Sequence, residues 1–412
     1  MARSAARAGR ASDKVKTAAH SRCGAVTFVN ARLSDGTTST LRIAGRRISA
    51  LGEGPLPGDI VVDLHGDRLL PGFINAHDHL HLNSLPPLES HERYRHVREW
   101  IADINDRRRS DPDFENRLAA SRDERLLIGG VKNLLSGVTT VAHHDALYPF
   151  LSRADYPVSV IAEYGWSHSL YIDGETGVRG SLEATPGNWP WIIHAAEGSD
   201  DEASREFDRL DALGCLKANT LLVHGIALDR RQRERLHEAG AGLIWCPSSN
   251  LRLFGKTADV RALIAQGRVA LGTDSRLSGS RDLLEEMRIA GEAVELEDSA
   301  IQSLVTDAGA RLLRLADRGV LKVGARADLL VLPSAARLRA TARADVRLVL
   351  HGGTVRYGDL DCARSVSPAS DWARIRVDGK PKILDAQIAA RLSRADSSEA
   401  GLELSATVGR AA

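Results

Sequence analysis

The chain has 412 residues, of which 43% are hydrophobic and 26% are charged, and its formal net charge at pH 7 is +1. This length and ordinary composition suit one α/β barrel of roughly 250 residues with accessory segments. The balanced charge and the 4% aromatic content argue against a nucleic-acid or membrane partner. No apolar run is long enough to span a membrane.

Residues 1–22 are basic and rich in Ala and Ser, and they lack the apolar segment of a secretory signal. Their composition overlaps that of an organelle transit peptide, but a disordered extension is the simpler expectation. The four cysteines are far apart and form no CxxC pair. A disulfide framework and a zinc knuckle are therefore not expected, which fits a cytoplasmic protein.

The segments that flank the middle of the chain are rich in short strand patterns. "GAVTFVNARL" and "LRIAGRRISALG" are typical of strands joined by a turn, and "VGARADLLVL" and "VRLVLHGGTVRYG" repeat the pattern far downstream. We expect residues 23–66 and 320–360 to form one composite β-sandwich domain. Residues 361–412 are expected to be a C-terminal tail, with a helix at "ILDAQIAARLSR".

Residues 67–319 alternate between short apolar runs and helical patterns. The clearest helices are predicted over residues 121–137, 229–240 and 280–294, between runs such as "GVTTVAHH", "WIIHAAE" and "VALGTDS". This alternation predicts a parallel sheet, either a barrel or a doubly wound fold. Neither GxGxxG nor GxxxxGK[ST] follows any of these runs, so a nucleotide phosphate site is not expected.

Metal-capable side chains stand at the C-terminal ends of four apolar runs. In a parallel barrel these ends meet on one rim, where active sites form. Each residue alone is weak evidence for a metal site, because an HxH pair is commonly accidental and a histidine at a strand end commonly has a structural role. Together they favour a site for one Zn²⁺, with Fe²⁺ or Mn²⁺ as alternatives. The residues are His77, His79, His194, His224 and Asp274.

The blocks "LLPGFINAHDHLH", "SGVTTV", "IHAAE", "VHGIALD", "CPSSNLRL" and "LGTDS" resemble, in this order, those of the amidohydrolase superfamily. They are most similar to its deaminases and chlorohydrolases of guanine, cytosine, S-adenosylhomocysteine and triazine compounds. The resemblance covers roughly residues 25–357. It implies a (β/α)8 TIM-like barrel with a small β domain.

The resemblance also implies a role for each matching residue. His77, His79, His194 and Asp274 would bind the metal, and Asp274 would also take a proton from the metal-activated water. Glu197, three residues after a ligand, would be the proton shuttle, although it could instead be a solvated residue at the start of a helix. His224 would orient the water. No Lys ends a strand between Val141 and His194, which favours one metal ion over two.

Substrate contacts are predicted with less support from the motifs. His81, Asn83, Trp166, His143 and Ser248 are candidates on expected rim loops, whereas the neighbouring Asn250 is interpreted as a turn residue. His143 and His144 follow "GVTTVA" as an adjacent pair, and one of them could point into the site as a substrate contact or an additional metal ligand. A structural role, or a role in supporting the ligands from outside, is the preferred interpretation of the pair.

The middle of the predicted barrel departs from the family. Only about 25 residues separate "VSVIAEYGW" from "WIIHAAE", which is short for a barrel unit, so the fourth βα unit is expected to be abbreviated. If the run ending at Glu163 were the fourth strand, Glu163 could bridge a second ion.

The resulting prediction is a hydrolase acting on C–N bonds other than peptide bonds. We expect a deaminase that releases ammonia from an amino-substituted N-heterocycle or a related amidine-type small molecule. The alternatives are an amide or cyclic-imide hydrolase with the same site and, less favoured, a non-catalytic scaffold. The resemblance also implies a homo-oligomer, a dimer or larger.

Overall fold

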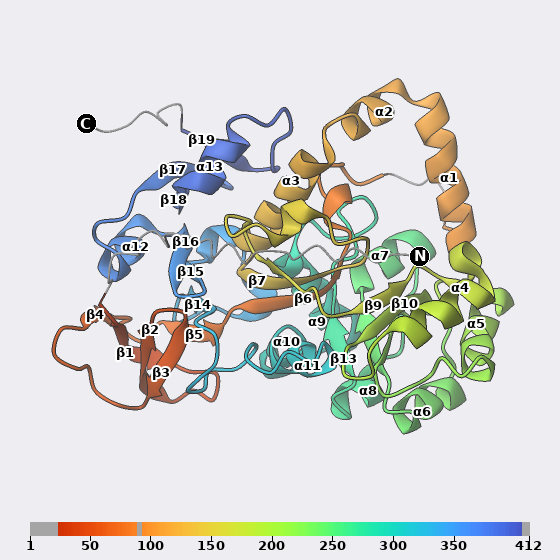
Figure 1. Cartoon of the computed structure of the whole chain (residues 1–412), viewed down its shortest axis with the longest axis horizontal. Coiled ribbons are helices and arrows are strands. Elements are labelled where there is room, and N and C mark those ends of the chain that lie inside the picture. Colours follow the sequence, from red (N-terminus) through yellow and green to blue (C-terminus); the bar gives the residue numbers. More distant parts are fainter. Residues whose placement is uncertain (1–23, 89–92, 406–412) are drawn as a thin grey trace, which may run out of the picture.

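The computed structural model describes residues 24–88 and 93–405 (Figure 1). The basic extension expected over residues 1–22 lies outside the described residues. Within the described ranges, no helix combines the length and the apolar character needed to cross a bilayer.

Two parallel sheets form the barrel part of the fold. One has the strand order β6-β7-β8, and the other has the order β9-β10-β11-β12-β13. Their residues are almost all buried, because helices cover one face of the strands and the barrel interior covers the other. The strands are β6 (Phe73–Asp78), β7 (Val138–His143), β8 (Ser159–Val160), β9 (Gly165–Ser167), β10 (Trp191–Ala195), β11 (Thr220–His224), β12 (Gly242–Trp245) and β13 (Val269–Leu271).

The first and last of these strands meet, which joins the two sheets on one side. Asp78 at the end of β6 bridges Asp274 just after β13, and the His77 carbonyl accepts the Thr273 N–H at 2.9 Å. A Cβ added to Gly272 would lie 2.7 Å from the His77 Cβ. The glycine of "LGTDS" therefore permits the close approach that brings residues nearly two hundred positions apart together.

The predicted helices are present, and their ends follow from capping residues. α6 begins with a capping box formed by Asp229 and Gln232, and α7 ends at Gly255, whose φ is 72°. The helices of the barrel part are α1 (Val97–Ser110), α2 (Pro112–Leu118), α3 (Arg122–Leu135), α4 (Leu170–Ala184), α5 (Asp201–Ala212), α6 (Arg230–Glu238), α7 (Pro247–Phe254), α8 (Arg261–Ala265), α9 (Leu283–Val294), α10 (Asp298–Leu304) and α11 (Asp307–Leu312).

The shortened part of the barrel lies one unit earlier than the sequence indicated. Only residues 161–164 connect β8 to β9, without a helix, whereas β9 is followed by the full helix α4. The apolar run before Trp166 contains two short strands and not one, so counting runs placed the shortening too late. Glu163 lies on this connection and is exposed, which contradicts the alternative that it bridges a second ion.

The remaining strands form one continuous sheet from both ends of the described chain. In Figure 1 the red strands β1–β5 and the blue strands β14–β19 lie side by side, and β14 pairs antiparallel with β5. The strands are β1 (Val26–Arg32), β2 (Thr38–Ala44), β3 (Arg47–Leu51), β4 (Ile60–Asp63), β5 (Arg68–Pro71), β14 (Leu329–Leu332), β15 (Leu348–His351), β16 (Thr354–Gly358), β17 (Trp372–Val377), β18 (Lys380–Asp385) and β19 (Leu402–Leu404).

The segment expected to be a tail is largely part of this sheet. β17 pairs with β18 and β19, and the predicted helix is α13 (Ala386–Leu392), with α12 (Leu360–Val366) before it. The buried carboxylate of Glu399 contacts Arg276 at 2.5 Å and Arg343 at 2.6 Å. The segment after residue 361 is thereby tied to the loop that follows β13, at the rim of the barrel.

Short 3-10 helices complete the described elements, and the first of them carries site residues. η1 directly follows β6 and includes His81. They are η1 (Leu80–Leu82), η2 (Pro149–Ser152), η3 (Leu338–Ala340) and η4 (Arg343–Asp345).

Candidate metal centre

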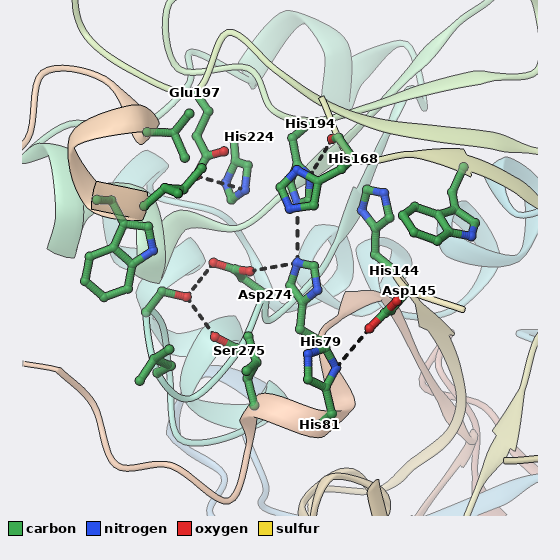
Figure 2. A pocket seen from close by; sticks show the side chains of 17 residues that line it. His79, His81, His144, Asp145, His168, His194, Glu197, His224, Asp274 and Ser275 are labelled. Atoms are coloured by element: carbon green, nitrogen blue, oxygen red, sulfur yellow. Dashed lines mark hydrogen bonds and ion pairs between the residues drawn. The ribbon is translucent and has the colours of Figure 1, made fainter. Parts of the chain in front are cut away.

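A cavity of about 260 Å³ lies at the C-terminal ends of the parallel strands (Figure 2). Its lining combines apolar side chains, among them Trp100 and Ile101 of α1, with histidine and carboxylate side chains. The lining residues are His79, His81, Leu82, Val97, Trp100, Ile101, His144, Asp145, Trp166, His168, His194, Glu197, His224, Asp274, Ser275, Leu277 and Ser278.

Four donor atoms converge at the base of this cavity. The His194 Nε2 lies 3.3 Å from the His77 Nε2 and 3.4 Å from the His79 Nε2. The Asp274 Oδ1 lies 3.7 Å from the His77 Nε2 and 3.6 Å from the His79 Nε2. Four ligands about 2.1 Å from a tetrahedral zinc ion would be about 3.4 Å apart. These residues can therefore hold one such ion.

Hydrogen bonds to neighbouring residues orient two of the four metal-binding side chains, His194 and Asp274. The His194 Nδ1 lies 2.8 Å from the His168 carbonyl oxygen, so this nitrogen carries the proton and the Nε2 lone pair faces the centre. The Ser278 hydroxyl donates to the Asp274 Oδ2 at 2.6 Å, which leaves Oδ1 free. Metal-binding side chains are commonly oriented by such partners.

A ring nitrogen of His144 also lies within 4.8 Å of those of His77, His79 and His194, but both nitrogens of His144 have other partners. Its Nε2 is 3.0 Å from the Ser167 carbonyl, which requires the proton on Nε2. Its Nδ1 then accepts from the His77 Nδ1 at 3.3 Å, and the His77 Nε2 keeps its lone pair. This contact with a candidate ligand agrees with the preferred interpretation of His144 as a residue that supports the site from outside.

The protonation states also suit a cation. Burial, and next the neighbouring His144, lower the pKa of His194 well below its ordinary value. Burial and His77 do the same for His79, so both rings are neutral at pH 7. Burial alone would raise the pKa of Asp274, but the facing histidines, His77 first, lower it below its usual range. Neutral imidazoles and an ionised carboxylate are the forms that bind metal.

Glu197 and His224 lie beside these donors at the cavity. The His224 Nε2 is 3.5 Å from the Glu197 Oε1, and the His224 Nδ1 is 2.8 Å from the Asn250 Oδ1. Burial raises the pKa of the Glu197 carboxyl well above its ordinary value, and the charges of Asp274 and Glu206 raise it further. Burial lowers the pKa of His224 to about 4. A neutral imidazole therefore faces a carboxyl group that readily holds a proton.

Two of these residues adopt backbone conformations that non-glycine residues rarely use. His224 has φ of 73° and Asp274 has φ of 57°, and both stand directly at or after a strand end. Such conformations concentrate at functional sites, where the surrounding structure maintains them.

The predicted substrate contacts divide into two groups. His81 and Trp166 line the cavity, but Asn83, His143 and Ser248 do not. The Asn83 side chain accepts from the buried Lys132 ammonium at 2.7 Å and donates to Asp78 at 2.6 Å. It therefore belongs to a polar network below the site.

The other two residues also have structural partners. The Ser248 N–H donates to the Glu286 carboxylate at 2.8 Å, while His143 packs beneath His81, with their ring centroids 5.8 Å apart. Asn250, interpreted from sequence as a turn residue, holds His224.

The sequence interpretation missed His168 and Asp145, which both line the cavity. His168 directly follows β9 and Asp145 follows β7 by two residues, so the strand-end rule that found the other residues applies to them. It failed because β9 has only three residues and is not visible as a separate apolar run.

Glu286 provides a pH-dependent test of the packing behind the site. Burial raises the pKa of the Glu286 carboxyl to about 8, above its ordinary value near 4.5. The folded protein therefore holds this proton more tightly than the unfolded chain. The resulting contribution to the free energy of unfolding is complete below pH 4.5 and is lost as the pH rises towards 8. We expect Glu286→Gln to become more stable relative to wild type between pH 5 and 8.5, by on the order of 3–5 kcal/mol. Thermal unfolding across this range measures it, and a difference independent of pH would contradict it.

Comparisons with known proteins agree with this arrangement. A sequence model of the amidohydrolase family matches residues 168–358. The 5-methylthioadenosine/S-adenosylhomocysteine deaminase of Halobacterium salinarum is 28% identical over 362 residues, which cover 75% of this chain and 82% of that protein. The 8-oxoguanine deaminase of Pseudomonas aeruginosa is 34% identical over 152 residues, which cover 33% of this chain and 34% of that protein.

Solved structures share the fold. The atrazine chlorohydrolase of Arthrobacter aurescens in complex with zinc superposes with a TM-score of 0.65 at 18% identity, covering 80% of this chain and 94% of that one. An adenosine deaminase from Xanthomonas campestris with bound zinc superposes with a TM-score of 0.67 at 19% identity. The match covers 84% of this chain and 97% of that one. The predicted α/β barrel with an added β sheet is confirmed by these neighbours.

Proposed function

We propose that this chain, which matches a sequence model of the amidohydrolase family over residues 168–358, is a metal-dependent hydrolytic deaminase of that family. Its substrate is an amino-substituted N-heterocycle or a related amidine-type small molecule, and ammonia is released. The observation that carries the proposal is the convergence of donor atoms of His77, His79, His194 and Asp274 at the base of a cavity that Glu197 also lines. The deaminase relatives support the same reaction class.

We assign one divalent ion, zinc, to these four residues. They fit zinc because the set combines three imidazole nitrogens with one carboxylate oxygen at tetrahedral spacing. Bound there, the ion would supply the Lewis acidity that makes water a nucleophile at neutral pH.

The chain's own residues move the protons. Asp274 accepts a proton from the attacking water, because the facing histidines keep its carboxylate ionised at neutral pH and an ionised carboxylate can take up a proton. Glu197 carries a proton to a ring nitrogen of the substrate and then to the departing amine. The step is required because an amine leaves readily only after protonation. His224, held by Asn250, orients the water and the developing tetrahedral centre.

The apolar side chains of the cavity support a flat ring as substrate. Trp100, Ile101 and Leu277 line the cavity together with the histidine cluster, and the Trp166 ring centroid lies 5.4 Å from that of His144. A heterocycle can pack against these side chains while its amino-bearing carbon faces the histidine and carboxylate side chains.

Ammonia release across a panel of heterocycles tests the proposed function. We expect turnover for at least one purine, pyrimidine, pterin or triazine bearing an exocyclic amine, with 5-methylthioadenosine, S-adenosylhomocysteine and 8-oxoguanine included because the relatives act on them. Absence of ammonia, together with turnover of lactams, cyclic imides or N-acyl compounds, would instead establish the amide-hydrolase alternative. Absence of all turnover would contradict an enzymatic role.

The implied partner is thus a small molecule. A homo-oligomeric state remains a prediction from the family resemblance, and size-exclusion chromatography with light scattering tests it. A cytoplasmic location remains a prediction from the spacing of the cysteines.

A further inference from the structure

A second cluster of metal-capable side chains lies at the edge of the cavity. It consists of His81, His143 and Asp145, whose donor atoms all lie within 4.8 Å of one another. None of them belongs to the four donors assigned above. His81 and Asp145 line the cavity, and Figure 2 shows the two side chains facing each other, with the His81 Nδ1 3.5 Å from the Asp145 Oδ2.

The fold holds these residues in place. His81 lies in η1, directly after β6, and His143 ends the neighbouring parallel strand β7. The buried Tyr164 hydroxyl hydrogen-bonds to the carbonyl oxygens of both His143 and Asp145. The turn that carries the carboxylate is therefore fixed relative to the strand that carries the imidazole.

Two nitrogen atoms of the cluster are buried without a hydrogen-bond partner. They are the His143 Nε2 and the His81 Nδ1, and His143 is completely buried. Buried polar atoms of native proteins are rarely left without a partner, and binding of an ion is one recognised reason for such a group. A His81–Asp145 pair alone would leave the His143 nitrogen unsatisfied.

The second nitrogen of His143 is compatible with metal binding at Nε2. The His143 Nδ1 lies 3.3 Å from the Asp78 carbonyl oxygen and 3.3 Å from the Leu80 N–H. When Nδ1 donates to the carbonyl, the buried Nε2 keeps a lone pair and has no other hydrogen-bond partner. A ring nitrogen hydrogen-bonded to a backbone carbonyl is the usual outer partner of a metal-binding histidine.

From this geometry we propose that His81, His143 and Asp145 form an accessory site for a divalent transition-metal ion. Two imidazoles and one carboxylate are a common donor set for zinc and for Fe²⁺, and three protein ligands leave a coordination position open. That position faces the cavity, where water or a lone pair of a bound molecule completes it. The site is additional to the ion on which the proposed function rests.

Metal counting tests the proposal without depending on turnover. Full-length protein is saturated with zinc, passed through gel filtration and analysed by mass spectrometry. We expect two zinc ions per chain for wild type and one for both His143→Ala and Asp145→Asn. Titration against a chromophoric chelator should show that these two variants lose the second binding step.

Matched variants separate the possible sources of zinc. His194→Ala should also hold one ion, because it removes a ligand of the main centre and leaves the accessory site. His65→Ala, at an exposed histidine, and Cys362→Ser, within the surface group Asp359, Asp361 and Cys362, should both keep two. Thermal unfolding shows whether His143→Ala folds, and the half-buried Asp145→Asn provides an independent variant if it does not.

Two results would overturn the accessory site. One is a single zinc ion per chain in wild type at saturation, and the other is two ions retained by both His143→Ala and Asp145→Asn. Loss of the second ion in Cys362→Ser alone would assign it to the surface group. These results leave the deaminase proposal intact, which fails instead if His194→Ala loses no zinc and ammonia release is absent.

Discussion

Glu197→Gln is expected to lower kcat by about 10²- to 10⁴-fold while the zinc content stays unchanged. Glutamine has the shape of glutamate but cannot carry a proton to the substrate or to the leaving amine. The Glu197 carboxyl is buried beside His224 at 3.5 Å, and burial together with nearby carboxylates raises its pKa. These surroundings suit a group that alternates between its protonated and ionised forms.

The loss of kcat in Glu197→Gln should come from the missing proton transfer and not from a loss of zinc or of folding. Glu197 is not one of the four converging donors, so the variant should bind zinc like wild type and unfold at a similar temperature. Glu163→Gln makes the same chemical change at an exposed position and serves as the matched control, with an expected kcat close to that of wild type. A Glu197→Gln rate within a few-fold of wild type would refute the shuttle role.

His194→Ala is expected to remove the ion of the main centre and all measurable turnover. The substitution deletes a nitrogen that lies 3.3 Å and 3.4 Å from the Nε2 atoms of His77 and His79. Three ligands remain, and the weakening of zinc binding should exceed the roughly 10–100-fold loss that follows removal of an outer partner. Elemental analysis should show one zinc ion fewer per chain than wild type.

Two controls complete this experiment. His65→Ala tests whether loss of any histidine lowers the zinc content, and it should not, because that side chain is 82% exposed and lies outside the cavity. Chelation of wild-type protein should abolish turnover, and added zinc should restore it. Unchanged zinc content in His194→Ala would contradict the ligand assignment, whatever the activity.

Residues at the ends of apolar runs could be predicted because a parallel barrel brings all its strand ends to one rim. The sequence rule therefore found His77, His79, His194, His224 and Asp274, and the structure brings all of them together. Their exact partners could not be predicted. Which nitrogen of His194 faces the centre depends on the His168 carbonyl, a contact between neighbouring strands.

The adjacent pair His143 and His144 illustrates the same limit. Alternation along a strand predicts that the two side chains point in different directions, but not which one points towards the centre. The pairing of β7 with β6 decides this. As a result His144 contacts His77, and His143 lies beside His81 and Asp145.

The sequence by itself determined the strand-end donors, the main helices and the β-rich character of both flanking segments, because periodicity and capping are local properties. Only the tertiary structure decided that the barrel shortens between β8 and β9, that the segment after residue 361 extends the sheet, and that two separate clusters of metal-capable residues border one cavity. Short strands and partner atoms depend on contacts between distant residues. Such contacts leave no periodic trace in one sequence.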